Sequence, residues 1–204
     1  MTSASRTALW SVSGLAGALV LTAATMLFEG TGLTGTTDGL RVTARFSYAF
    51  FWLAYVGGAL AILFGPTFNI IARRSREFGL SFASAQLVHV GLVIWLAWIS
   101  PPQPIRDAIM PFFAIGVVWT YLLAGLSMDQ ARDLFGPDML RGLRTIGSEY
   151  IALTFFTDFV LLPTYPPPHL ILYIPFWLML LIGPLLRLAA AIKATLSPRL
   201  AVIS

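Results

Sequence analysis

The polar side chains of this sequence that are suited to chemistry lie inside long apolar segments. Gln86 and His89 are three residues apart, so on a helix they share one face. A neutral imidazole in such a place is a ligand for haem iron or a relay for protons. The alternative is a structural role, in which His89 hydrogen-bonds a neighbouring helix and Gln86 joins helices in the same way. Position alone leaves both open.

Two carboxylates, Glu149 and Asp158, lie nine residues apart in another apolar segment. At about 100° per residue, this separation turns them about 180° from each other on a helix, so they cannot form a paired-carboxylate site. We expect each to be an interfacial or ion-paired group, with Arg141 and Arg144 in reach of Glu149. The alternative is a path for protons or cations, because charges within a bilayer are costly and often functional.

Six long apolar segments must position these side chains. A bilayer crossing needs about 20 mostly apolar residues. The chain has such segments at 8–28, 46–71, 80–99, 108–126, 146–162 and 170–192. We therefore predict an all-α membrane protein, a six-transmembrane-helix bundle that forms a single transmembrane domain over residues 1–204. The longest predicted connections are the Gly- and Thr-rich segment 29–45 and the polar segment 127–145, and a stiff proline break lies at 165–168.

The composition excludes a water-soluble protein. Hydrophobic residues make up 57% of the chain and charged residues 11%, and the mean hydropathy is +0.81. Soluble domains are roughly 45–50% apolar and about 25% charged. The length leaves no room for a soluble nucleotide or flavin domain beside six spans, so such a domain would belong to another protein. With no cysteine, the chain has no disulfide, thiolate metal site or Cys-ligated iron–sulfur cluster.

The basic residues predict that both ends lie in the cytoplasm. The formal charge of +4 reports topology in a membrane protein, and we expect the lipid bilayer rather than nucleic acid as its partner. With the N-terminus inside, ten basic residues face inward: Arg6, Arg73, Arg74, Arg76, Arg132, Arg141, Arg144, Arg187, Lys193 and Arg199. Only Arg41, Arg45 and Arg106 face outward. The segment 8–28 also has features of a signal peptide, but it is longer than the usual apolar region, so we expect a retained helix.

Three motifs follow one another in the middle of the chain. The first is Ala44-Arg45-Phe46-Ser47, and the second is RRSREFGL at 73–80, with His89 ten residues after Gly79. The third combines LSMD at 126–129, FGP at 135–137 and LRGLRTIG at 140–147. In their order and spacing, over about residues 40–165, these motifs resemble the bacterial ferric reductase-like transmembrane family. That family includes the haem-binding membrane subunit of the periplasmic methionine sulfoxide reductase system.

The resemblance implies a bacterial inner-membrane location and a haem b site, but part of the ligand set is missing. The family holds haem b between histidines of its third and fifth spans, which implies haem contacts at His89 and Gln86. In this chain, Arg144 occupies the position of the family's fifth-span histidine, and Thr157 occupies a second position where a histidine is common. An arginine cannot ligate iron, because it stays protonated and has no free lone pair. His169, beyond the fifth span, is a poor substitute.

Three functions are compatible with these residues. In the first, the chain is a haem-free scaffold or accessory subunit, and Arg144 and Glu149 form a buried ion pair in the space of the haem. In the second, it transfers electrons through one haem b on His89 and, as a membrane oxidoreductase subunit, needs a separate redox partner as donor. In the third, it conducts protons or a solute through Gln86, His89, Glu149 and Asp158.

Overall fold

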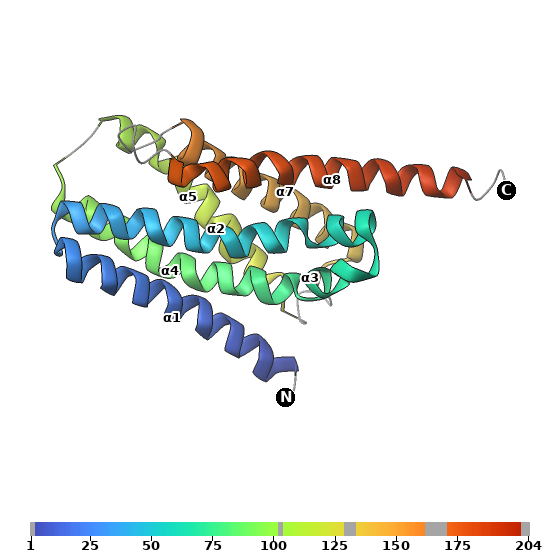
Figure 1. Cartoon of the computed structure of the whole chain (residues 1–204), viewed down its shortest axis with the longest axis horizontal. Coiled ribbons are helices and arrows are strands. Elements are labelled where there is room, and N and C mark those ends of the chain that lie inside the picture. The colour runs from blue at the N-terminus through green and yellow to red at the C-terminus, as the bar shows by residue number, and fades with distance from the viewer. Residues whose placement is uncertain (1–2, 102–103, 129–133, 162–170, 201–204) are drawn as a thin grey trace.

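The computed structural model of this chain is helical throughout the residues that it describes (Figure 1). It describes residues 3–101, 104–128, 134–161 and 171–200, with the side chains of 5–101, 108–128, 134–161 and 171–196. The elements are α1 (Ser3–Glu29), α2 (Leu33–Phe64), η1 (Pro66–Phe68), α3 (Asn69–Arg73), α4 (Ser75–Ile99), α5 (Pro104–Gly125), α7 (Pro137–Phe156), the π-helical turn η2 (Thr157–Leu161) and α8 (Ile174–Leu200). The predicted all-α class is confirmed for these residues.

Five helical stretches are long and apolar enough to cross a membrane. They are Ser5–Glu29, Leu33–Phe64, Ser75–Ile99, Ala108–Gly125 and Ile171–Leu196. These stretches support a multi-pass membrane protein. The predicted fifth span lies in α7 and η2, which do not reach the same apolarity. The cause is the four charged residues of α7, which are Asp138, Arg141, Arg144 and Glu149.

The prediction of a long connection at 29–45 is wrong, because most of that segment is helix. A short turn at Gly30, whose φ is +81°, joins α1 directly to α2. A Cβ atom on Gly35 would collide with the Gly30 carbonyl, so only glycine allows this close reversal. Thr43 is fully buried, and its hydroxyl lies 2.8 Å from the Gly39 carbonyl one turn back. Tertiary packing thus overrides the weak helix propensity of the Gly- and Thr-rich sequence.

Two further boundaries differ from the predicted ones. The second predicted span, 46–71, ends early, because α2 stops at Gly65, whose φ is +80°, a conformation suited to glycine. Residues after it belong to η1 and α3. The predicted connection 127–145 is shorter than expected, since α7 begins at Pro137, in the first turn where proline is well tolerated.

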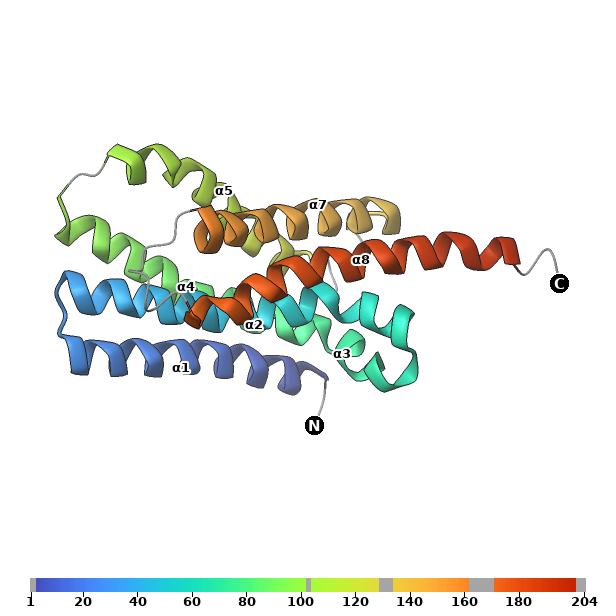
Figure 2. The ribbon, with the colours of Figure 1, turned by 45° about the horizontal axis from the view of Figure 1, so that its top comes forward.

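The helices pack in two groups with α8 lying along α2. α1, α2 and α4 pack side by side, and α5 packs against α7 (Figures 1 and 2). Arg6 forms a 3.6 Å ion pair with Glu77 at the start of α4, and Lys193 donates to the Ile62 carbonyl at 2.7 Å. The N-terminal end of α1, the α2–α4 connection and the C-terminal half of α8 therefore lie at one end of the bundle.

Small residues bring α1 against α4. The Ser81 hydroxyl donates to the Trp10 carbonyl at 2.8 Å, across the two helices. A Cβ on Gly14 would collide with the Ser81 backbone of α4, and one on Gly17 would meet the Phe46 ring of α2. Close backbone approach at small residues is a common way to hold helices together in lipid. These contacts pack α1 closely against its neighbouring helices in the bundle.

Aromatic rings fill the centre of the bundle. We call Tyr48, Phe51, Phe82, Phe155 and Phe159 the aromatic core. They come from α2, α4, α7 and η2, and all five are buried. Ring centroids are 4.7 Å apart for Tyr48 and Phe155, 5.3 Å for Phe51 and Phe82, and 6.0 Å for Phe82 and Phe155. Such pairs contribute about 0.5–1.5 kcal/mol each beyond their buried area.

Candidate functional site

Three polar side chains meet between α2, α7 and α8, and we call Tyr55, Glu149 and Arg187 the polar triad. Arg187 Nε lies 3.0 Å from Glu149 Oε1, and the Tyr55 hydroxyl donates to Glu149 Oε2 at 2.7 Å. Arg187 Nη1 also donates to the Tyr55 carbonyl at 3.2 Å, and the guanidinium lies 4.4 Å from the centre of the Tyr55 ring. Both oxygens of Glu149 are therefore engaged, and one carboxylate joins three helices.

The predicted ion pair between Arg144 and Glu149 is wrong. Five residues apart on a helix, these side chains point about 140° away from each other. Glu149 turns to Arg187, whereas Arg144 Nη2 donates to the Leu126 carbonyl just beyond the end of α5, at 2.7 Å. The sequence alone places Arg187 on the inner side of the membrane and predicts no partner for it. An arginine inside the last apolar segment was itself a signal, because a charge within a span requires a partner.

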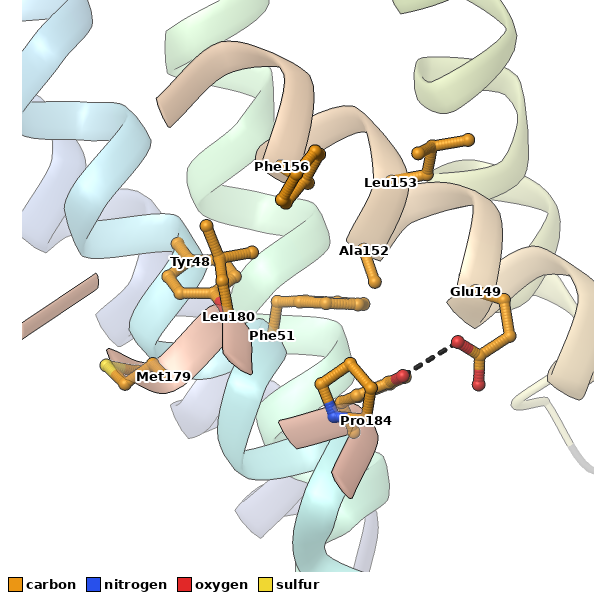
Figure 3. A pocket seen from close by; sticks show the side chains of 10 residues that line it. Tyr48, Phe51, Glu149, Ala152, Leu153, Phe156, Met179, Leu180 and Pro184 are labelled. Atoms are coloured by element: carbon orange, nitrogen blue, oxygen red, sulfur yellow. Dashed lines mark hydrogen bonds between the residues drawn. The ribbon is translucent and has the colours of Figure 1, made fainter. Parts of the chain in front are cut away.

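A cleft opens beside the triad, and we call it the α2–α7–α8 cleft. One part has a volume of about 220 Å³ and an adjoining part about 300 Å³, and both are lined by Tyr55, Glu149 and Pro184. Figure 3 shows the apolar part, with Tyr48 and Phe51 from α2, Ala152, Leu153 and Phe156 from α7, and Met179 and Leu180 from α8. The second part reaches Arg187. The cleft is thus apolar along most of its length and polar at one end.

His89 lies in a different place, against α2. Its Nδ1 atom is 3.1 Å from Thr43 Oγ1. The Thr43 hydroxyl is within 2.8 Å of the Gly39 carbonyl, which takes its single hydrogen, so we assign the imidazole N–H as the donor to Thr43. Gln86 Oε1, one turn away, is buried and has no hydrogen-bond partner among the described residues. His89 therefore makes the interhelical hydrogen bond of the structural alternative.

The residues present do not fit a haem held by two histidines. The space between α4 and α7, where the resemblance implies a macrocycle, is filled by Phe82 and Phe155 of the aromatic core. At the two positions where histidines would be expected, Arg144 is bound to the Leu126 carbonyl and Thr157 to the Leu153 carbonyl. The second histidine of the chain, at position 169, lies outside the described residues. Within the described part, no group of three His, Cys, Asp or Glu residues is placed to hold a metal ion.

Asp158 is separate from the polar triad. It lies in η2, half-buried, about 13 Å further along the helix axis than Glu149. Where the structure describes both partners, Asp158 makes neither a hydrogen bond nor an ion pair. Nor does any hydrogen bond there join Gln86, His89, Glu149 and Asp158 to one another. Within the described part of the chain, these four polar residues are thus not linked to one another by direct hydrogen bonds.

Comparisons with known proteins leave the family open. No protein-family model matches the chain, and neither characterised proteins nor solved structures show significant similarity to it. The ferric reductase-like resemblance therefore stays a prediction that rests on the motifs themselves.

Proposed function

We propose that this chain is a haem-free member of the ferric reductase-like family in a bacterial inner membrane. It crosses the membrane six times, with both ends in the cytoplasm, and acts as a scaffold or accessory subunit. The observation that carries this proposal is the aromatic core. Phe51, Phe82 and Phe155 pack where the family would hold its macrocycle, with centroids 5.3–6.0 Å apart.

The packing of α7 supports a sixth crossing. Its Gly147 lies against Trp119 of α5, and its Thr154 fits beside Gly116 of the same helix. Glu149, the acidic residue in its middle, finds both of its partners within the bundle. A helix with a polar face can cross a membrane when neighbouring helices satisfy that face.

The arrangement of charge supports cytoplasmic termini. Arg6 and Lys193 lie at the same end of the bundle as the basic connection between α2 and α4, which carries Arg73, Arg74 and Arg76. Basic residues accumulate on the cytoplasmic side of membrane proteins.

An accessory role agrees with how the polar groups are used. Tyr55, Glu149 and Arg187 bind one another across three helices. Arg144 of α7 donates to the Leu126 carbonyl just beyond α5, and His89 of α4 forms a hydrogen bond with Thr43 of α2. These contacts fix the positions of helices relative to one another, which is the work of a structural subunit.

An absorption spectrum of the detergent-purified chain, oxidised and dithionite-reduced, tests the absence of haem. We expect no Soret band at stoichiometric strength, even after growth with a haem precursor. A stoichiometric b-type spectrum that His89→Ala abolishes would refute the proposal and establish electron transfer through a single haem.

The size of the native complex tests the accessory role. We expect mild-detergent extracts of native membranes to contain the chain in a complex with another protein at fixed stoichiometry. If the chain migrates only as its own 22.2 kDa protomer or a homo-oligomer, the accessory role is refuted.

A further inference from the structure

Residues 65–74 join two stretches that are long and apolar enough to cross a membrane. One stretch ends at Phe64 and the next begins at Ser75. The connection between them contains η1, α3 and Arg74, and it lies at the end of the bundle where both termini lie (Figures 1 and 2). Because an apolar stretch enters the connection and another leaves it, the connection lies at the boundary of the hydrocarbon layer, where phospholipid headgroups are found.

The connection presents one apolar side chain and two cations on the same face. Ile70 lies three residues before Arg73 and four before Arg74, a spacing that places all three on one side of a helix. The Arg74 N–H donates to the Ile70 carbonyl at 3.2 Å, so this interval is helical. Ile71 packs against the hydrophobic core, and the face that carries Ile70 therefore points away from the bundle. Ile70 is 57% exposed, Arg73 is exposed and Arg74 is half-buried.

The charge of this face is positive and is not balanced by the chain. Within the described residues, the side chains of Arg73 and Arg74 form neither a hydrogen bond nor an ion pair. Residues 65–74 include no acidic residue. Glu77, three residues after Arg74, is 13% exposed and pairs with Arg6 at 3.6 Å. An anion can therefore approach both guanidinium groups without meeting an unpaired carboxylate.

The type of cation and its neighbours indicate which anion fits. A guanidinium presents a planar set of donors that matches the oxygens of a phosphate group. Two exposed apolar side chains accompany the arginines, Ile70 and Phe64 at the end of α2, which is 56% exposed. The Phe64 ring is held in place by the Phe68 ring, with centroids 5.6 Å apart. A phosphate that carries acyl chains uses both the cations and the apolar side chains, whereas a free phosphate ion uses only the cations.

We propose that Arg73 and Arg74 bind the phosphate group of an anionic phospholipid, with its acyl chains beside Ile70 and Phe64. Two adjacent positive charges favour a lipid with a net negative charge over a zwitterionic lipid. The proposal goes beyond a scaffolding role. It does not depend on the absence of haem or on the side of the membrane that the connection faces.

The test adds phosphatidylglycerol or phosphatidylcholine to the full chain in detergent micelles. Bound lipid is counted by native mass spectrometry, and affinity is measured from the rise in Tm with lipid concentration. We expect saturable binding of phosphatidylglycerol, at least about tenfold tighter than that of phosphatidylcholine. Inorganic phosphate, added alone over the same range, should leave Tm unchanged.

The double variant Arg73→Gln, Arg74→Gln removes both cations and should bind phosphatidylglycerol no more tightly than phosphatidylcholine. Arg141→Gln is the matched control, because Arg141 is an 80% exposed arginine of α7 that pairs with Asp138. We expect it to keep the affinity of the wild type for phosphatidylglycerol. Should the double variant fail to fold, Arg73→Gln alone, at an exposed side chain, should lower this affinity about fivefold.

Three results would overturn the proposal. The first is equal affinity of the wild type for the two lipids. The second is wild-type affinity for phosphatidylglycerol in the double variant or, where only it folds, in Arg73→Gln. The third is a rise in Tm with inorganic phosphate that matches the rise with phosphatidylglycerol, because the site would then bind a free anion rather than a lipid.

Discussion

The polar triad should show strong energetic coupling between Arg187 and Glu149. We consider Arg187→Met, Glu149→Gln and the double variant, with the free energy of unfolding measured by denaturant titration in detergent micelles. Arg187→Met leaves the carboxylate with only the Tyr55 hydroxyl, whereas Glu149→Gln leaves the guanidinium without a counter-charge. The double variant removes both charges together.

The expected magnitude follows from distance and exposure. Removing one member of a fully buried ion pair costs about 3–5 kcal/mol. With side chains 29% and 48% exposed, we expect about 2–3 kcal/mol for Arg187→Met and about 1–2 kcal/mol for Glu149→Gln. We expect the double variant to lose about 2 kcal/mol, less than the two losses together. The coupling energy should therefore be at least about 1 kcal/mol.

Arg141 and Asp138 form the matched control pair on α7. Their charged atoms are 3.6 Å apart, but the side chains are 80% and 93% exposed. Such a pair should show a coupling below about 0.5 kcal/mol. If the Arg187–Glu149 effects add to within about 0.5 kcal/mol, the triad is not a coupled unit and the reasoning is refuted.

Two other predictions concern packing. Gly14→Ala should lower the free energy of unfolding by about 1–3 kcal/mol, because its Cβ collides with the Ser81 backbone. Gly91→Ala in α4, where a Cβ meets open space, should be neutral or stabilising in the same titration, and equal losses at both sites would contradict the α1–α4 contact. Phe155→Ala should cost about 3–5 kcal/mol, since it leaves a void in the aromatic core. Phe156→Ala, at a side chain 41% exposed, should cost far less, and a similar loss for both would show that the core is not packed as described.

Hydrophobicity predicts the helices of this chain better than it predicts their ends. Each of the six predicted spans overlaps a helix, because runs of apolar residues long enough for a bilayer have few other structures open to them. The start of α2 was missed, since Gly35, Thr36 and Gly39 are typical of loops by propensity. They are helical because small, buried residues allow α2 to pack closely against its neighbours, which a single sequence does not reveal.

Individual polar residues were found, but not their partners. Glu149 and His89 were both singled out by their position in apolar segments. Their partners, Arg187 and Thr43, lie on helices far away in the sequence. Spacing within one helix predicts which side chains share a face, and it excluded a pairing of Glu149 with Asp158. Applied to Arg144, the same geometry would have excluded its pairing with Glu149 as well.

The hydrogen bonds between α2 and α8 have a mechanical consequence. Trp52 Nε1 donates to the Met179 carbonyl at 2.8 Å, while Arg187 and Lys193 donate from α8 to carbonyls of α2. One of these bonds is donated by α2 and two by α8, at three positions along the helix pair. Together they oppose sliding and rotation of the two helices, so we expect α2 and α8 to move as one unit. The α5–α7 pair is a second unit, which contacts the first through aromatic rings and through Glu149. The α2–α7–α8 cleft lies at the interface between the two helix pairs. A small separation of the pairs would therefore widen the cleft without unwinding any helix.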